Sequence, residues 1–304
     1  MNNTSNSLVS GIDPASFSAV TGPSQDLFRF VNGPWVDMYR LPDDRSRYGS
    51  FDKLAEDAEN QIRDILEEDD CPAVKSRALY HSFLDVDAID AAGLAAIEDQ
   101  LASIDEAEDK AALTRALGAM NPTGGPDLIG IAVYGDPGAP ETNVVHIEQD
   151  GLDLPDEAYY REDHYAPIRE AYVEMVAKQL KNAHLAAGDE DAHAQAKRFL
   201  DVETRIAANH WDNVSTRDSV KTYNPTDYAD LCAMLADVDL DAWIDAWQNA
   251  YDATTAAAVQ PLDFRGCFSH TIVHEPSFLT GLNAFWKEAS LDDLKLWARV
   301  HVVI

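Results

Sequence analysis

Apolar residues recur at helical spacing over most of this chain of 304 residues, and this pattern limits the folds open to it. The clearest stripe consists of Ile168, Ala171, Tyr172, Met175, Val176, Leu180 and Ala183. Charged residues border the stripe, which is typical of a helix with one face against a core. Helices are predicted at 26–35, 51–66, 74–84, 91–104, 107–120, 167–187, 192–211, 228–236 and 241–251. The predicted fold class is mainly α.

The ends of the first two helices carry recognisable signals. Asp26 precedes the first helix and Ser50 precedes the second, and short polar side chains of this kind cap helix N-termini. Gly33 and Pro34 stand late in the first helix, and this pair usually ends or breaks a helix. The first helix is therefore predicted to stop at Trp35.

The exception to the helical pattern lies between residues 128 and 149. Two runs rich in β-branched residues, 128–134 and 143–147, flank a segment rich in Gly and Pro at 135–140. This arrangement predicts one β-hairpin with a long loop. No internal repeat, low-complexity tract or Pro/Gly/Ser-rich linker divides the chain. The expected architecture is a multi-helical body with one β-hairpin.

The charge balance argues against two classes of partner. The chain has 54 Asp and Glu against 23 Lys and Arg, a formal net charge of -31. A field of that sign repels phosphate backbones and anionic lipid headgroups, so neither nucleic acid nor a membrane is an expected partner. It attracts cationic ligands, or it serves only to keep the protein in solution.

The N-terminus and the cysteines suggest a cellular location. The first 20 residues lack a basic start and an apolar run long enough for a signal peptide or a membrane span. Cys71, Cys232 and Cys267 are far apart in sequence and form no C-x-x-C pair. These features predict a cytoplasmic protein with reduced thiols.

The motifs of common enzyme classes are missing from these residues. The sequence contains no G-x-S-x-G, P-loop or G-x-G-x-x-G pattern. His270 and His274 have the spacing of two metal ligands on a helix, but the residues between them favour an extended strand, in which they would lie about 13 Å apart. His274 and Glu275 begin like H-E-x-x-H, yet Pro276 and Phe278 break that motif. Neither a metal site nor a catalytic residue is expected in this chain.

Several ordered blocks of sequence resemble one known family. They are residues 26–35 (DLFRFVNGPW), 45–52 (RSRYGSFD), 79–85 (LYHSFLD), 151–160 (GLDLPDEAYY), 221–225 (KTYNP) and 275–279 (EPSFL). Single blocks of this length carry little weight, but their order along the chain is similar to that of neprilysin-type zinc metalloendopeptidases. The resemblance extends from about residue 26 to residue 304.

The resemblance implies an N-terminal portion without the catalytic half. The family holds its zinc with H-E-x-x-H and a downstream glutamate, none of which occurs here. No cofactor is therefore expected in this chain, and no peptide hydrolysis by it alone. The expected partner is the missing catalytic half, which would hold the zinc and, in the full enzyme, act on oligopeptides. The chain would be a natural truncation, half of a split gene or a deliberately shortened protein.

The same resemblance implies a division of the chain into segments. Residues 1–25 would be a polar tail, and 26–70 would pack on the missing catalytic lobe. Residues 71–282 would form a helical cap lobe that admits oligopeptides and excludes folded proteins, and 283–304 would be a return helix. Large apolar residues would then have lost part of their burial, namely Phe28, Phe30, Trp35, Trp297, Val302 and Val303. That surface would stay mobile, form a dimer or bind the catalytic half.

The resemblance also implies two substrate-contacting residues. Arg47 matches the family arginine that pairs with the C-terminal carboxylate of short peptides, and Asp52 matches a carboxylate that orients it. A planar guanidinium accepts a carboxylate in a two-bond fork, which lysine cannot do. The alternatives are that Arg45 fills this role, or that Arg47 makes an ordinary surface ion pair.

A different class of function also fits the composition. A non-catalytic helical binding or scaffold module could use its acidic surface to recruit a basic partner. Such a module would need no second half. The coding sequence downstream of residue 304 would distinguish the two hypotheses, because only the first requires an H-E-x-x-H motif there.

Overall fold

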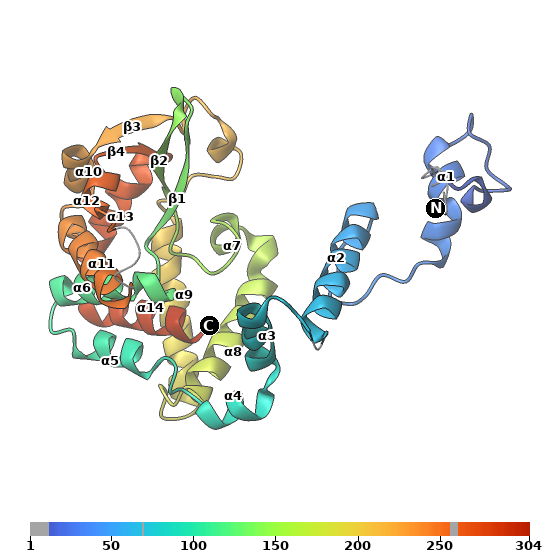
Figure 1. Cartoon of the computed structure of the whole chain (residues 1–304). Coiled ribbons are helices and arrows are strands. Elements are labelled where there is room, and N and C mark those ends of the chain that lie inside the picture. The colour runs from blue at the N-terminus through green and yellow to red at the C-terminus, as the bar shows by residue number, and fades with distance from the viewer. Residues whose placement is uncertain (1–11, 69, 256–260) are drawn as a thin grey trace. The chain divides into compact units, whose positions relative to one another are not determined.

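A computed structural model describes residues 12–68, 70–255 and 261–304 (Figure 1). These residues belong to two compact units, Met1–Ile89 and Asp90–Ile304. Helices predominate in both, and the described strands form one small sheet. The mainly α prediction is confirmed.

The N-terminal unit contains a short 3-10 helix, Pro14–Ser16, and the helices α1 (Leu27–Met38), α2 (Ser50–Glu67) and α3 (Val74–Leu84). The Asp26 side chain caps α1 as predicted, because it accepts a hydrogen bond from the Arg29 N–H at 2.9 Å. The second cap was predicted wrongly. Helix α2 begins at Ser50 itself, and the Asp52 carboxylate accepts the Gly49 N–H at 2.8 Å.

Helix α1 does not end at its Gly-Pro pair. Proline has no N–H, so Pro34 leaves the Phe30 carbonyl without its helical donor. The Ser18 N–H donates to that carbonyl at 2.7 Å. Since a buried or half-buried carbonyl needs a partner, this bond from outside the helix lets α1 continue to Met38.

The C-terminal unit holds most of the described helices. The described helices from the unit boundary onward are α4 (Val86–Ala92), α5 (Glu98–Glu106), α6 (Lys110–Met120), α7 (Ala158–Arg161), α8 (Ala166–Asn182), α9 (Asp189–Ala207), α10 (Tyr228–Met234), α11 (Leu240–Thr254), α12 (Phe264–Cys267), α13 (Pro276–Glu288) and α14 (Leu291–Val303). The one helix predicted at 91–104 is instead two. Gly93 lies between them with φ +53°, a left-handed conformation that ends a helix and suits glycine.

One core joins these helices to the sheet. Phe199 of α9, Trp286 of α13 and Trp297 of α14 are all fully buried in it. Helices α6 and α11 approach closely at Gly118, where an added Cβ would lie 2.3 Å from the Trp243 carbonyl oxygen. The prediction that Trp297 lost its burial is wrong, because its indole N–H donates to the Gly151 carbonyl at 3.1 Å inside this core.

The sheet has the order β1-β2-β4-β3. Strands β1 (Ile129–Asp136) and β2 (Ala139–Gln149) form the predicted antiparallel hairpin. Strand β4 (His270–Val273) joins β2 in parallel, and β3 (Asn224–Asp227) joins β4 in antiparallel pairing. The extended conformation predicted between His270 and His274 is thus confirmed, but a single hairpin was an incomplete description.

The hairpin turn is tighter than predicted. The strands continue through most of the 135–140 segment and leave only Pro137 and Gly138 between them. The Asp136 carboxylate closes this turn, because it accepts the Gly138 N–H at 2.7 Å and the Tyr223 hydroxyl at 2.9 Å. Tyr223 lies 87 residues away, so no local pattern announces this bond.

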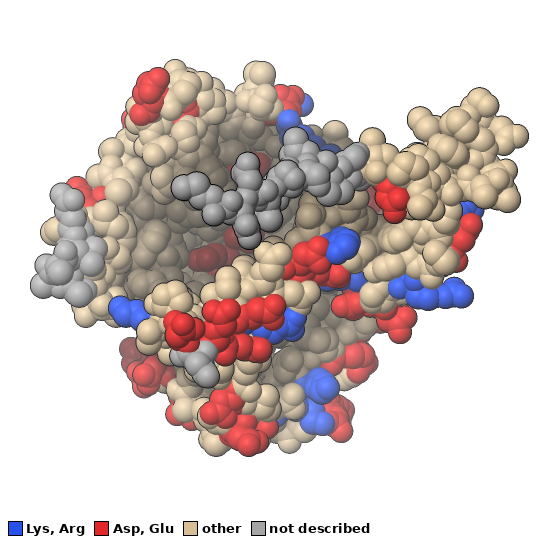
Figure 2. Space-filling model, turned by 45° about the vertical axis from the view of Figure 1, so that its right-hand side comes forward, with Lys and Arg blue, Asp and Glu red and all other residues tan. Residues whose placement is uncertain are grey.

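The surface reflects the charge imbalance. Figure 2 shows clusters of Asp and Glu side chains, mainly on the lower half of the visible face, with fewer Lys and Arg among them. Many of the basic groups are paired with acids, such as Arg265 with Asp245 at 2.7 Å and Arg198 with Asp293 at 2.6 Å. Because the chain has 54 acidic and only 23 basic side chains, many carboxylates remain without a basic partner even so.

Candidate functional site

The segment between α1 and α2 carries the predicted site residue Arg47. An aromatic stack fixes both ends of this segment. Trp35 of α1 stacks on Tyr39 with ring centroids 4.7 Å apart, and Tyr39 stacks on Tyr48 at 4.6 Å. Offset aromatic pairs of this kind stabilise by about 0.5–1.5 kcal/mol beyond the area they bury. The stack therefore holds the chain on either side of the segment in one arrangement.

Glu56 of α2 binds two residues on either side of Arg47, namely Arg45 and Tyr48. The Tyr48 hydroxyl donates to the Glu56 carboxylate at 2.6 Å, and the Arg45 Nη2 lies 3.6 Å from the same carboxylate. The hydrogen bond to Glu56 raises the pKa of Tyr48 well above its usual range, so the hydroxyl stays protonated and donates at neutral pH. Glu56 was not singled out from the sequence, because Tyr48 and Arg45 lie outside α2 and no helical spacing relates them to Glu56.

Arg47 itself is exposed and lies between these anchors. Among the residues described, no hydrogen-bond or ion-pair partner of its guanidinium is found, whereas Arg45 has Glu56. Asp52 lies at the start of α2, and its carboxylate is engaged by the Gly49 N–H. The structure thus brings Arg45, Tyr48 and Glu56 together, and it places Asp52 in a capping position beside them.

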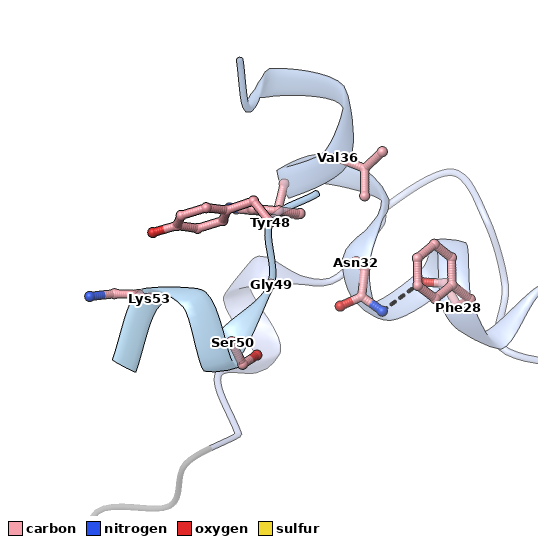
Figure 3. A pocket seen from close by; sticks show the side chains of 8 residues that line it. Phe28, Asn32, Val36, Tyr48, Gly49, Ser50 and Lys53 are labelled. Carbon is pink, nitrogen blue, oxygen red and sulfur yellow. Dashed lines mark hydrogen bonds between the residues drawn. The ribbon is translucent and has the colours of Figure 1, made fainter. Parts of the chain in front are cut away.

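A pocket of about 330 Å³ opens beside this segment. Phe28, Asn32 and Val36 line it from one face of α1, and Figure 3 shows them opposite Ser50 and Lys53 of α2. The remaining lining residues are Trp35, Tyr48 and Gly49. Its walls are apolar except for a few amide, hydroxyl and ammonium groups, a lining suited to part of a peptide or of another protein chain. The aromatic residues of the 26–35 block were the sequence signal for it.

The helices of the N-terminal unit, α1, α2 and α3, leave their apolar faces uncovered. Among described residues, α2 and α3 contain no buried side chain, and the one buried residue of α1 is Gly33. Phe28 is 64% exposed, Phe51 87% and Phe83 80%. The other exposed large apolar residues of these helices are Leu27, Val31, Trp35, Val36, Met38, Leu54, Ile62, Ile65, Val74, Leu79 and Leu84. Apolar surface of this extent marks an interaction site.

Comparison with known proteins identifies the family. Residues 23–304 match the model for the N-terminal region of peptidase family M13. This chain belongs to peptidase family M13. Human neprilysin is 25% identical over 298 residues, which cover 91% of this chain and 39% of the human protein. The resemblance inferred from the sequence blocks is confirmed, and the chain is the M13 N-terminal domain of a neprilysin-like metallopeptidase.

Solved structures agree with this M13 assignment. The zinc metalloprotease Zmp1 of Mycobacterium tuberculosis, in complex with an inhibitor, superposes with a TM-score of 0.83 at 32% identity, over 96% of this chain and 43% of that one. PepO from Lactobacillus rhamnosis, 18% identical, has a TM-score of 0.71 over 93% of this chain and 43% of that one, and supports the fold alone. The chain thus spans about two fifths of these relatives.

The M13 family is zinc-dependent, but the residues described here do not fit that metal. No group of three or more His, Cys, Asp or Glu side chains among them could hold a metal ion. His270 Nε2 lies 3.5 Å from Asp136, whereas His274 Nε2 lies 2.9 Å from His146 Nδ1. The two histidines therefore face different partners. No helix in the described part of the chain is both long and apolar enough to cross a membrane.

Proposed function

We propose that this M13 domain forms the substrate-sizing part of a neprilysin-like zinc metalloendopeptidase and supplies Arg47 to bind the C-terminal carboxylate of oligopeptide substrates. The catalytic zinc belongs to the other half of the enzyme, and this chain alone is inactive. The observation that carries the proposal is the set of uncovered apolar faces on α1, α2 and α3. Each large apolar side chain left exposed forgoes about 1.5–3 kcal/mol, so a partner that covers them would bind favourably.

The neighbourhood of Arg47 supports its assigned role. A guanidinium that binds a ligand carboxylate must be free of internal acids, and it must also be held in place. Arg47 has no acidic partner within the described residues. The contacts of Arg45 and Tyr48 with Glu56 hold the segment around it in place. In the proposal, Asp52 acts indirectly, by fixing the start of α2. Family membership does not favour the alternative of an independent acidic binding module.

The first prediction concerns the purified chain by itself. We expect no tightly bound zinc and no cleavage of a fluorogenic oligopeptide, because the described residues offer no metal-binding group. Metal analysis by mass spectrometry and a peptidase assay with and without chelator would measure both. The variant His274→Ala serves as a control and should leave both results unchanged. One zinc per chain together with chelator-sensitive activity would contradict the proposal.

A further inference from the structure

Strand β1 forms a long edge of the sheet that no described strand covers, and its pairing with β2 is irregular only at its end, between Gly135 and Asp136. The opposite edge is β3, which has four residues and contains Pro225, both features that prevent further strand pairing. Strand β1 has eight residues and contains neither Pro nor Lys. No strand in the described part of the chain pairs with its outer side, which Figure 1 shows on the side of β2 away from β4. Val133 and Tyr134 on it are 64% and 58% exposed.

The hydrogen bonds of the neighbouring strand show which backbone groups of β1 point outward. The Ile147 carbonyl accepts the His274 N–H at 2.9 Å, so Ile147 turns its backbone groups away from β1. The direction alternates along a strand. The backbone N–H and C=O of Glu148 therefore point toward β1, where its partner is Gly130. It follows that the backbone groups of Gly130 point toward β2, whereas the N–H and C=O of Ile131 point to the open side.

Carboxylates gather on one face of the sheet near this open edge. Glu148 and Gly130 are cross-strand partners and lie on the same face. Gly130 has no side chain there, and a Cβ at this position would lie 3.5 Å from Asp150 Oδ2. Burial, followed by the charge of Asp150, raises the pKa of Asp127 to about 6. A cation at this place would relieve the repulsion among these acids.

We propose that the outer edge of β1 binds an extended oligopeptide by strand addition and holds a basic side chain of that peptide beside Glu148 and Asp150. The outward N–H and C=O groups of Ile131 and Val133 would pair with the peptide main chain. Side chains of an extended peptide alternate between faces. Every second residue of the peptide would therefore lie on the face that carries Glu148.

The charge distribution favours such a peptide over a second copy of the chain. Antiparallel pairing of two β1 edges would place the Asp127 end of one copy against the Asp136 end of the other. Both copies also carry a formal net charge of -31, so their acidic surfaces would repel each other. A basic peptide would instead be attracted by this acidic surface. This site needs neither zinc nor a catalytic half, so its test is independent of the proposed function.

The test is a titration of the full chain with a labelled eight-residue peptide of alternating Lys and Val, followed by fluorescence anisotropy. We expect saturable binding, and binding about tenfold or more weaker for an alternating Glu and Val peptide. Two N-methylated versions of the Lys and Val peptide separate strand addition from simple charge attraction. One carries methyl groups on the odd-numbered backbone nitrogens and the other on the even-numbered ones. One version should lose about tenfold or more in affinity and the other little, because only alternate N–H groups face the strand. Equal affinity of the two versions would overturn the proposal.

Variants of the chain provide a second line of evidence. Val133→Pro removes one outward N–H and should weaken binding about tenfold, whereas Val133→Thr keeps that donor and should stay within about twofold. Glu148→Gln should weaken binding of the Lys peptide but not of an uncharged Gln and Val peptide. Circular dichroism checks that each variant is folded, and the N-methyl comparison needs no variant. A folded Val133→Pro chain with unchanged affinity, or a dimer that this variant dissociates without any peptide binding, would overturn the inference.

Discussion

Arg47→Ala is expected to reduce hydrolysis of short peptides with a free C-terminus about 10- to 100-fold, once a separately produced M13 catalytic half from the same organism has restored activity to this chain. That range corresponds to the loss of hydrogen bonds between a guanidinium and a carboxylate. Amidated versions of the same peptides should lose far less, because only a free carboxylate occupies the two-bond fork. The measurement is kcat/KM for each acid and amide pair.

Matched variants separate this role from a general effect of charge. Arg40→Ala removes an exposed arginine from the same segment. It should change kcat/KM only slightly, and to the same extent for acid and amide substrates. Arg47→Lys keeps the charge but not the fork, so it should recover only part of the preference. Equal losses for acid and amide substrates would remove Arg47 from the substrate site. Failure of the two halves to associate would count against the proposed partner instead.

Glu203→Ala is expected to destabilise the chain by about 3–5 kcal/mol, because each buried donor left without an acceptor costs about 1–3 kcal/mol. Glu203 is fully buried in α9. Its carboxylate accepts the hydroxyls of Tyr160 at 3.0 Å and Tyr172 at 2.9 Å, and the Asp153 N–H at 2.9 Å. Burial raises the pKa of both tyrosines, so both hydroxyls remain protonated. Removing the carboxylate leaves all three donors without a partner.

Urea denaturation of the full chain measures this effect through the free energy of unfolding. Tyr172→Phe removes only one donor, and the expected loss is about 1 kcal/mol. Asp201→Ala removes an exposed acid from the same helix and should stay within about 0.5 kcal/mol. A loss below about 1 kcal/mol for Glu203→Ala would show that the network relaxes or admits water.

The sequence by itself determined the features that depend on residues close together in the chain. A helix repeats its environment every three or four residues, so the 168–183 stripe predicted α8, and the Asp26 cap could be assigned from its position alone. The hairpin was found from two local runs rich in β-branched residues on either side of a Gly- and Pro-rich segment. The ordered blocks from 26–35 to 275–279 identified the family, because they carry specific residue types and not only a pattern of polarity.

Only the tertiary structure decided the features that join distant residues. The extended conformation of β4 was predicted from its own residues, but its place in the sheet depends on parallel pairing with β2, more than 120 residues earlier in the chain. Helix α1 passes Pro34 with a donor that Ser18 supplies from outside the helix. The indole N–H of the buried Trp297 finds its acceptor in the distant Gly151 carbonyl. In the site, the sequence indicated Arg47, but the partners of its neighbours depend on how α2 returns Glu56 to Arg45 and Tyr48. Such contacts are fixed by packing, which no local spacing encodes.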